Sequence, residues 1–213
     1  MILFLKSRSR TVHHYEEEEK EYKNEESCIS LTVWRKSLLL SCKGFTVIGS
    51  DGNLVYRVDN YTLRPDRIIL MDGSGKPIFT ICRRKKLKVV AENNWLVYEG
   101  EVGKKNMDSS KKPMFSVRKN ISIMKTKPSV VAYVYGGVSE KGYDYVIEGS
   151  YEHRSCKILD GSRRVVSEIK KKEALSNGGG VSFGLEVFDL IVNPGIDSRF
   201  AMAIVLLLDQ MFS

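Results

Sequence analysis

The chain ends in a run, Phe200 to Ser213, that has the composition of a helix and is apolar nearly all the way round. Asp209 and Gln210 are its only strongly polar side chains. A helix without a polar face must be enclosed by other parts of a structure. Spanning a bilayer takes about 20 apolar residues, more than this run contains. We therefore expect a buried helix over about residues 198–212, with Asp209 at the mouth of its enclosure or paired, because an unpaired buried carboxylate is costly.

Most of the remaining chain consists of short runs rich in β-branched and aromatic residues, in which apolar and polar side chains alternate. Turn residues separate these runs, a pattern typical of consecutive β-strands. Three connections contain Asp-Gly, which favours a hairpin because glycine adopts positive φ freely. They are Asp51-Gly52, Asp72-Gly73 and Asp160-Gly161. The twelve predicted strands cover residues 30–34, 45–48, 54–58, 67–71, 78–82, 95–100, 114–118, 131–135, 143–148, 153–159, 164–170 and 185–192.

An antiparallel sheet leaves two exposed edges unless it closes on itself. Closure of about twelve strands gives a barrel whose interior must be filled. The terminal helix is the segment apolar enough to fill it. The sequence therefore predicts a mainly β fold, a closed antiparallel barrel of about twelve strands around a buried C-terminal α-helix.

The first part of the chain differs from the rest. Residues 1–27 contain a dense acidic cluster and few large apolar groups, so we expect a disordered tail before a single domain over residues 28–213. The apolar stretch at the start is too short for a secretory signal. Four widely spaced cysteines without a CxxC pair indicate reduced thiols. We expect a monomeric intracellular protein, cytoplasmic, at the periphery of the plasma membrane or shuttling to the nucleus.

Several blocks of the sequence resemble the plant LURP-one-related family. The first runs from Val47 to Asp59 and the second from Trp95 to Tyr98, and they are followed by Ser155 to Ile158. The last block is Asn193 to Asp197, directly before the apolar helix. The order and spacing of the blocks make the resemblance specific, and it extends from about residue 29 to the end of the chain.

This resemblance implies a tubby-like fold, a twelve-stranded barrel around a central C-terminal helix, similar also to phospholipid scramblases. The family has no established catalytic activity, and some members are linked to plant defence. Tubby proteins hold phosphoinositide headgroups through basic residues, and scramblases are associated with calcium-dependent movement of lipids. These properties of related proteins are expectations for this chain.

Enzyme-like motifs are incomplete. Gly180 to Gly184 fits the GxSxG nucleophile elbow, which needs a later acid and then a histidine. No histidine follows His153, and His13 and His14 lie in the predicted tail. No His, Cys, Asp and Glu combination has zinc spacing, and Asp51-Gly52-Asn53 does not complete an EF-hand loop. We expect no enzyme activity, no cofactor and no metal site.

Clusters of basic residues are the strongest indication of a binding function. The formal net charge is +8, which favours anionic partners. Groups of 4–8 lysines and arginines are typical of sites for anionic lipids. Smaller groups are Lys104-Lys105, Lys111-Lys112 and Lys170 to Lys172. The candidate headgroup ligands are Arg83, Arg84, Lys85, Lys86 and Lys88.

Nucleic acid is the rival anionic partner. Single-strand binders interleave aromatic side chains with their basic residues, and no aromatic residue lies between Arg83 and Lys88. Tyr133, Tyr135, Tyr143 and Tyr145 alternate in a way that is typical of cross-strand packing. We therefore expect a phospholipid or phosphoinositide as the partner, or another protein, and no nucleic acid.

Three functional hypotheses follow from the sequence. The first is a non-catalytic, membrane-associated binding or regulatory module in plant defence or stress signalling. The second is a protein-interaction scaffold without lipid binding, which uses the tail or the segment 103–112 as its contact surface. The third is lipid scrambling, which requires the terminal helix to enter a bilayer. That helix is short for this task, so we expect a leaflet-exchange assay to be negative.

Overall fold

The computed structural model describes residues 27–60, 67–83, 94–103, 112–120, 130–136, 142–173 and 184–212. The predicted tail over residues 1–27 lies almost entirely outside this part of the chain. The described residues form twelve strands and one helix, in agreement with the prediction.

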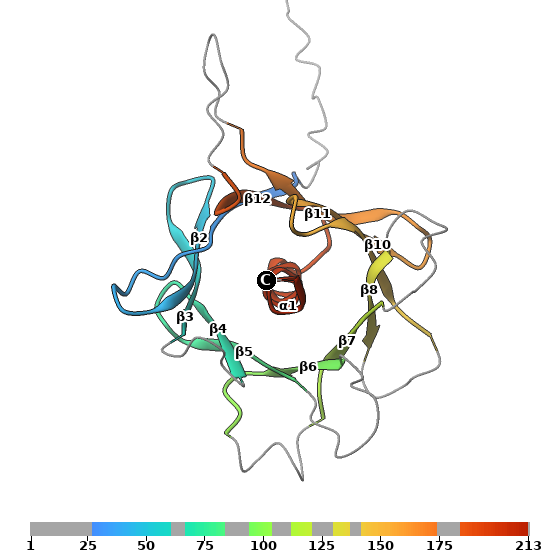
Figure 1. Cartoon of the computed structure of the whole chain (residues 1–213), viewed down its shortest axis with the longest axis horizontal. Coiled ribbons are helices and arrows are strands. Elements are labelled where there is room, and N and C mark those ends of the chain that lie inside the picture. The colour runs from blue at the N-terminus through green and yellow to red at the C-terminus, as the bar shows by residue number, and fades with distance from the viewer. Residues whose placement is uncertain are drawn as a thin grey trace, which may run out of the picture.

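The twelve strands close into one antiparallel barrel, in which each strand pairs with its neighbours in sequence and β1 pairs with β12 (Figure 1). The strands are β1 (Ile29–Trp34), β2 (Lys43–Gly49), β3 (Leu54–Asn60), β4 (Arg67–Asp72), β5 (Pro77–Arg83), β6 (Asn94–Glu99), β7 (Phe115–Lys119), β8 (Val130–Gly136), β9 (Tyr145–Ser150), β10 (Ser155–Asp160), β11 (Val165–Lys171) and β12 (Val187–Val192).

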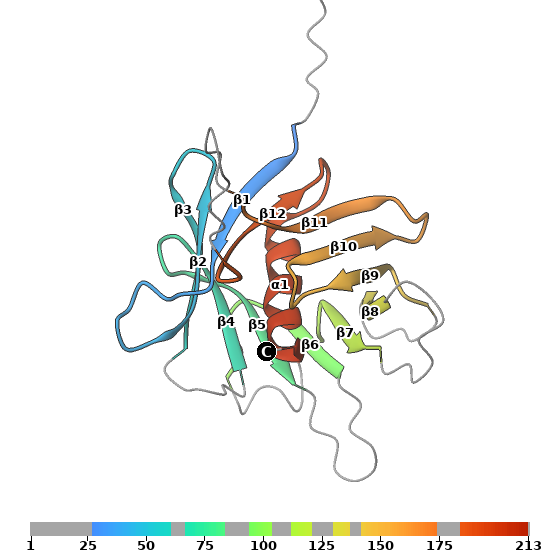
Figure 2. The same cartoon turned by 45° about the horizontal axis from the view of Figure 1, so that its top comes forward.

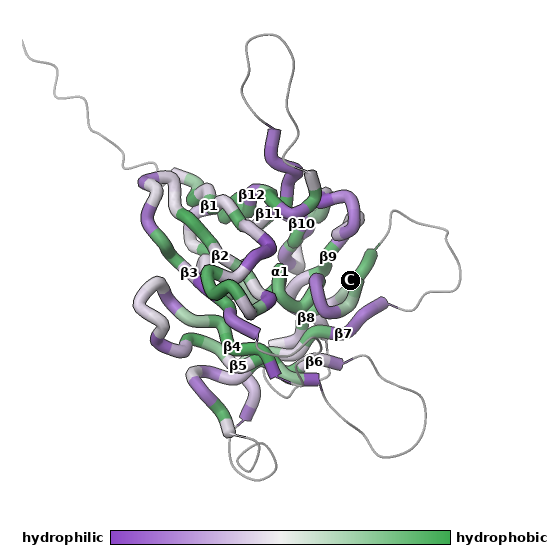
Figure 3. Tube along the Cα trace, turned by 60° about the vertical axis from the view of Figure 1, so that its left-hand side comes forward, coloured by the Kyte–Doolittle hydropathy of each residue, from purple (hydrophilic) through white to green (hydrophobic). Residues whose placement is uncertain are grey.

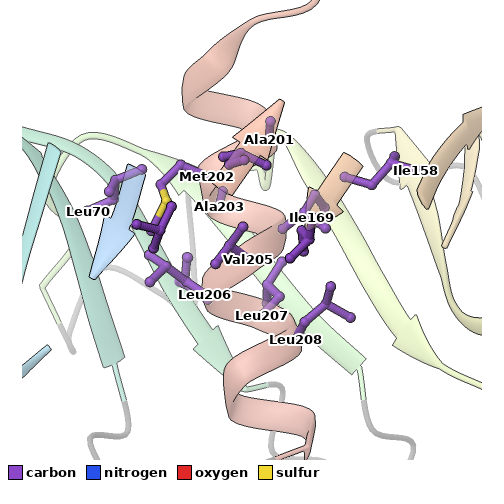
Figure 4. Packing of buried hydrophobic residues seen from close by; sticks show 14 of the residues in the cluster. Leu70, Ile158, Ile169, Ala201, Met202, Ala203, Val205, Leu206, Leu207 and Leu208 are labelled. Atoms are coloured by element: carbon purple, nitrogen blue, oxygen red, sulfur yellow. The ribbon is translucent and has the colours of Figure 1, made fainter. Parts of the chain in front are cut away.

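The helix α1 (Ser198–Phe212) runs through the middle of the barrel (Figures 1 and 2). Every residue from Ala201 to Asp209 is buried, and the apolar ones contact side chains from the inner faces of the strands (Figure 4). The Asp197 carboxylate begins the helix by accepting the Arg199 N–H at 2.8 Å. A helix that is apolar all round is therefore enclosed on all sides, as its composition requires.

Alternation along the strands matches this arrangement. In β12, buried side chains alternate with half-buried ones, and Phe188, Leu190 and Val192 face the interior. Figure 3 shows hydrophobic stretches along the strands, with hydrophilic residues at many turns between them. One face of each strand contributes to the core, and the opposite face forms the outer wall of the barrel.

The barrel has two different ends. We call the end at which α1 begins the amino end and the end at which it finishes the carboxyl end. The three predicted hairpins lie at the amino end, where Asp51, Asp72 and Asp160 each accept a backbone N–H from the residue two positions later. Hydrogen bonds hold the pKa of each aspartate below its usual value, chiefly from the Asn53 N–H at Asp51, the Ser74 hydroxyl at Asp72 and the Arg164 N–H at Asp160. The carboxyl end carries the other connections between consecutive strands, which are β1–β2, β3–β4, β5–β6, β7–β8, β9–β10 and β11–β12.

Three predicted strands begin two residues later than expected. The strand expected from His153 begins at Ser155, because residues 151–154 form a turn in which Arg154 has a φ of 52°. The predicted starts at residues 143 and 185 likewise move to Tyr145 and Val187. Alternation alone does not show where a strand gives way to a turn.

Across the described residues, α1 included, no helix has the length and apolar content needed to cross a membrane.

Candidate functional site: the carboxyl end of the barrel

The two ends of the barrel carry different charge. In the described connections and the adjoining terminal residues of the strands, acidic side chains outnumber basic ones at the amino end, and the reverse holds at the carboxyl end. The acidic residues of the amino end are Asp51, Asp72, Glu99, Glu101, Asp144, Asp160 and Asp197, beside Lys76, Lys112, Arg163 and Arg164. The basic residues of the carboxyl end are Arg35, Lys36, Lys43, Arg67, Arg83, Lys119, Arg154, Lys171 and Lys172, beside Glu152, Glu173 and Glu186.

A pocket of about 170 Å³ opens at the carboxyl end, where α1 finishes. Its lining comes from three strands and the last turn of the helix, and consists of Arg83, Trp95, Lys119, Gln210 and Met211. The pocket therefore combines two cationic side chains with a largely polar lining.

Lys119 holds the end of the helix in place. Its Nζ donates to the Met211 carbonyl oxygen at 2.7 Å and lies 4.0 Å from the centre of the Phe212 ring. The last carbonyl groups of a helix have no partner within the helix and form the negative end of its dipole, so a cation is favourable there. An ammonium group has three N–H donors, which leaves Lys119 with capacity for a further acceptor.

Asp209 has the partner that its burial requires. The Nε of Arg35, in the β1–β2 connection, lies 2.8 Å from Oδ1 of Asp209, and the Tyr151 hydroxyl donates to the same oxygen at 3.2 Å. Burial and the neighbouring carboxylate both raise the pKa of Tyr151, which keeps the phenol neutral and able to donate. The helix is thus joined to the connections on two sides of the barrel.

The structure places the basic clusters of the sequence at different ends. Arg83 is exposed at the last position of β5 and lines the pocket, whereas Arg84, Lys85, Lys86 and Lys88 lie outside the described residues. Lys170 to Lys172 lie at the carboxyl end with Arg83, and Lys112 lies at the amino end. Lys104, Lys105 and Lys111 lie outside the described residues.

Sequence reasoning missed three features of the carboxyl end. Arg35 and Lys119 are single basic residues, and nothing around them in the sequence shows that they contact the helix. Leu38, Leu39 and Leu40 are exposed in the β1–β2 connection. The sequence does contain a signal for the exposed leucines, because three consecutive leucines lie outside any predicted strand and between basic residues.

The described residues contain no group of three or more His, Cys, Asp or Glu side chains arranged to hold a metal ion. All four cysteines are free. Burial raises the pKa of Cys82 to about 11 and that of Cys156 to about 12, which disfavours a nucleophilic thiolate at either position. Of the GxSxG motif only Gly184 is described, in a turn with a φ of 73°.

Comparison with known proteins identifies related sequences. Residues 29–209 match the family model described as LURP-one-related. Protein LURP-one-related 17 from Arabidopsis thaliana is 46% identical, with all of both chains covered. Protein LURP-one-related 8 from the same plant is 47% identical, over 87% of this chain and 88% of that one. A crystal structure of an Arabidopsis thaliana protein shares the fold, with a TM-score of 0.59 and 22% identity over 87% of this chain and 92% of the other.

Proposed function

The chain belongs to the LURP-one-related family, and on that premise we propose that it is a non-catalytic module that binds anionic phospholipid headgroups. The carboxyl end of the barrel is the surface that meets the membrane. The protein then acts at the cytoplasmic face of the plasma membrane, in plant defence or stress signalling.

The separation of charge between the two ends is the observation that supports this proposal most strongly. Among the described residues, basic side chains exceed acidic ones at the carboxyl end, where Glu186 and the helix residue Asp209 are already paired with Arg35. A surface with an excess of one charge attracts and orients a partner of the opposite charge. An anionic bilayer would therefore meet the barrel with the carboxyl end towards it.

The pocket gives this surface a place for one headgroup. Arg83 and Lys119 supply positive charge, and Trp95 and Gln210 complete the lining beside Met211. The negative end of the helix dipole also faces this region and opposes an anion. Lys119 offsets it through its bond to the Met211 carbonyl oxygen, so the balance of charge at the pocket favours an anionic ligand.

The test is flotation with vesicles of phosphatidylcholine, alone or with phosphatidylserine or a phosphoinositide, at two salt concentrations. We expect binding to the anionic vesicles only, and weaker binding at higher salt because added ions screen surface charge. Equal and negligible binding to every vesicle would overturn the proposal and favour the protein-interaction scaffold.

Matched variants identify the end that binds. Lys43→Ala with Lys171→Ala removes two exposed charges from the carboxyl end, and Lys76→Ala with Lys112→Ala removes two from the amino end. We expect the first pair to weaken the free energy of vesicle binding by about 2 kcal/mol, because each charge near the membrane surface contributes about 1 kcal/mol. The second pair should change binding little, and an equal loss from both pairs would contradict the assignment.

The predicted headgroup ligands are tested in the same assay. Replacing Arg83, Arg84, Lys85 and Lys86 with alanine should abolish the preference for anionic vesicles if these residues hold the headgroup. Unchanged affinity in this variant would place the headgroup elsewhere on the carboxyl end.

A further inference from the structure

The β1–β2 connection presents three leucines to solvent at the carboxyl end. Leu40 is fully exposed, Leu38 is 51% exposed and Leu39 is 37% exposed. We propose that these leucines insert into the surface of the bilayer and anchor the barrel there. This inference rests on the proposed function, because it concerns the same membrane-facing end.

The exposure of the leucines is not explained by a lack of order in the connection, because its base is held by hydrogen bonds. The Arg35 N–H donates to the Glu186 carbonyl oxygen at 2.8 Å, beside the ion pair of Arg35 with Asp209. The Thr46 hydroxyl donates to the Lys36 carbonyl oxygen at 2.7 Å. These bonds join the start of the connection to α1, β2 and the start of β12.

Ser37 holds the middle of the connection. It is buried, and its hydroxyl donates to the Asp59 carboxylate, which also binds Arg57. The Leu39 N–H donates back to the Ser37 hydroxyl oxygen at 3.0 Å, and the Cys42 N–H donates to the Leu39 carbonyl oxygen at 3.1 Å, which closes a turn. Because the base of the connection is already fixed, the chain loses little conformational entropy when the tip of the connection enters a bilayer.

The connection projects away from the barrel wall, and Figures 1 and 2 show it as the blue loop that extends outward between β1 and β2. An apolar group at the tip of such a projection can reach a surface before the wall of the barrel does. The connection extends sideways at the level where α1 ends, so its leucines can enter a bilayer that meets this side of the carboxyl end.

The charges around the leucines match an anionic bilayer. Arg35, Lys36 and Lys43 flank them, and residues 35–43 contain no acidic side chain. Trp34 is partly exposed at the end of β1, with Nζ of Lys36 lying 5.3 Å from its ring centre. Apolar groups that enter the acyl region, basic groups at the headgroups and an aromatic residue at the boundary together are typical of interfacial membrane binding.

A second copy of the chain is a poorer occupant of this surface. A two-fold contact places the same patch of each copy against the other. Here it would bring the basic residues Arg35, Lys36 and Lys43 of one copy close to the same basic group of the other, and like charges repel. A lipid surface covers the leucines and neutralises the same basic residues.

The experiment compares the wild-type chain with a variant in which Leu38, Leu39 and Leu40 are all replaced by serine. Its control is Ile29→Ser with Met114→Ser, which removes two exposed apolar side chains from the amino end. In flotation with phosphatidylcholine vesicles that contain phosphatidylserine, we expect the leucine variant to lose binding about tenfold or more. The control should stay within about twofold, and circular dichroism confirms that both variants are folded.

A second measurement locates the loop in the bilayer. Leu40→Trp and Met114→Trp each add one tryptophan, at the carboxyl end and the amino end respectively, to the two already present. Lipids brominated on their acyl chains should quench the added fluorescence of Leu40→Trp and leave that of Met114→Trp unchanged.

Each other outcome overturns the inference. If the leucine variant binds like the wild type, or if Leu40→Trp is not quenched, the leucines do not insert, and the proposed function still stands. If light scattering shows a wild-type dimer and a monomeric leucine variant with equal vesicle binding, the leucines form a contact between copies. If the wild type binds no vesicle, this inference fails together with the proposed function.

Discussion

Asp209 is the charged residue that α1 carries into the core, and the sequence required it to have a partner or a place at the barrel mouth. The structure meets both conditions, because Asp209 lies near the carboxyl end and binds Arg35 and Tyr151. The need for a partner followed from the cost of burying a carboxylate. The sequence could not identify that partner as Arg35, because Arg35 lies near the other end of the chain and only closure of the barrel brings it close to Asp209.

The ion pair between Arg35 and Asp209 should contribute measurably to stability. We expect Arg35→Ala to lower the free energy of unfolding by roughly 2 kcal/mol, less than for a fully buried pair, because a third of the Arg35 side chain is exposed. The measurement is urea denaturation. Arg164→Ala, which breaks the exposed pair with Asp160, is the control and should cost no more than about 0.5 kcal/mol.

A double-mutant cycle separates this pairing from lost packing. Arg35→Ala combined with Asp209→Asn should cost clearly less than the sum of the two single changes, because Arg35→Ala alone leaves a buried carboxylate without its cation and the double variant does not. Strict additivity of the two changes would contradict a direct interaction.

At the scale of single elements, local sequence patterns predicted the strands, the helix and the Asp-Gly hairpins. Alternation located all twelve strands within a few residues, and Asp-Gly located three hairpins, because both signals arise from contacts between near neighbours. The exception is the turn at residues 151–154. There, the buried Arg154 side chain stacks on Tyr151 and Phe188 and donates a hydrogen bond to the Leu185 carbonyl oxygen. Two of these three partners are distant in the chain, so the local sequence pattern does not predict the turn.

The central helix gives the element-scale prediction. Leu207 is completely buried inside the barrel, so Leu207→Ala should lower the free energy of unfolding by about 2–5 kcal/mol. Leu207→Lys should abolish the folded state, since a buried lysine has no partner there. Circular dichroism and thermal unfolding measure both changes.

Gln210→Lys is the matched control in the same helix, because Gln210 is only half-buried and lines the pocket. It should fold normally. A Leu207→Lys protein that unfolds as cooperatively as the wild type would contradict the central placement of the helix.

At the scale of the whole molecule, the sequence predicted closure but not what closure brings together. Residues 170–172 and Arg83 lie far apart in the chain, and they share one end because the strands between them alternate in direction. The predicted headgroup ligands are one part of this larger basic surface. Lys119, Arg35 and the exposed leucines belong to it through the position of the helix and the fold of the β1–β2 connection.

The orientation of the barrel on a membrane is the central claim, and hydrogen–deuterium exchange with and without phosphatidylserine-containing vesicles tests it most directly. We expect vesicles to slow exchange of backbone amides in residues 35–42, at the carboxyl end. The amino-end turns at residues 51–53, 73–76 and 161–164 should exchange at unchanged rates. Slower exchange at those turns, or equal changes at both ends of vesicle-bound protein, would contradict the claim.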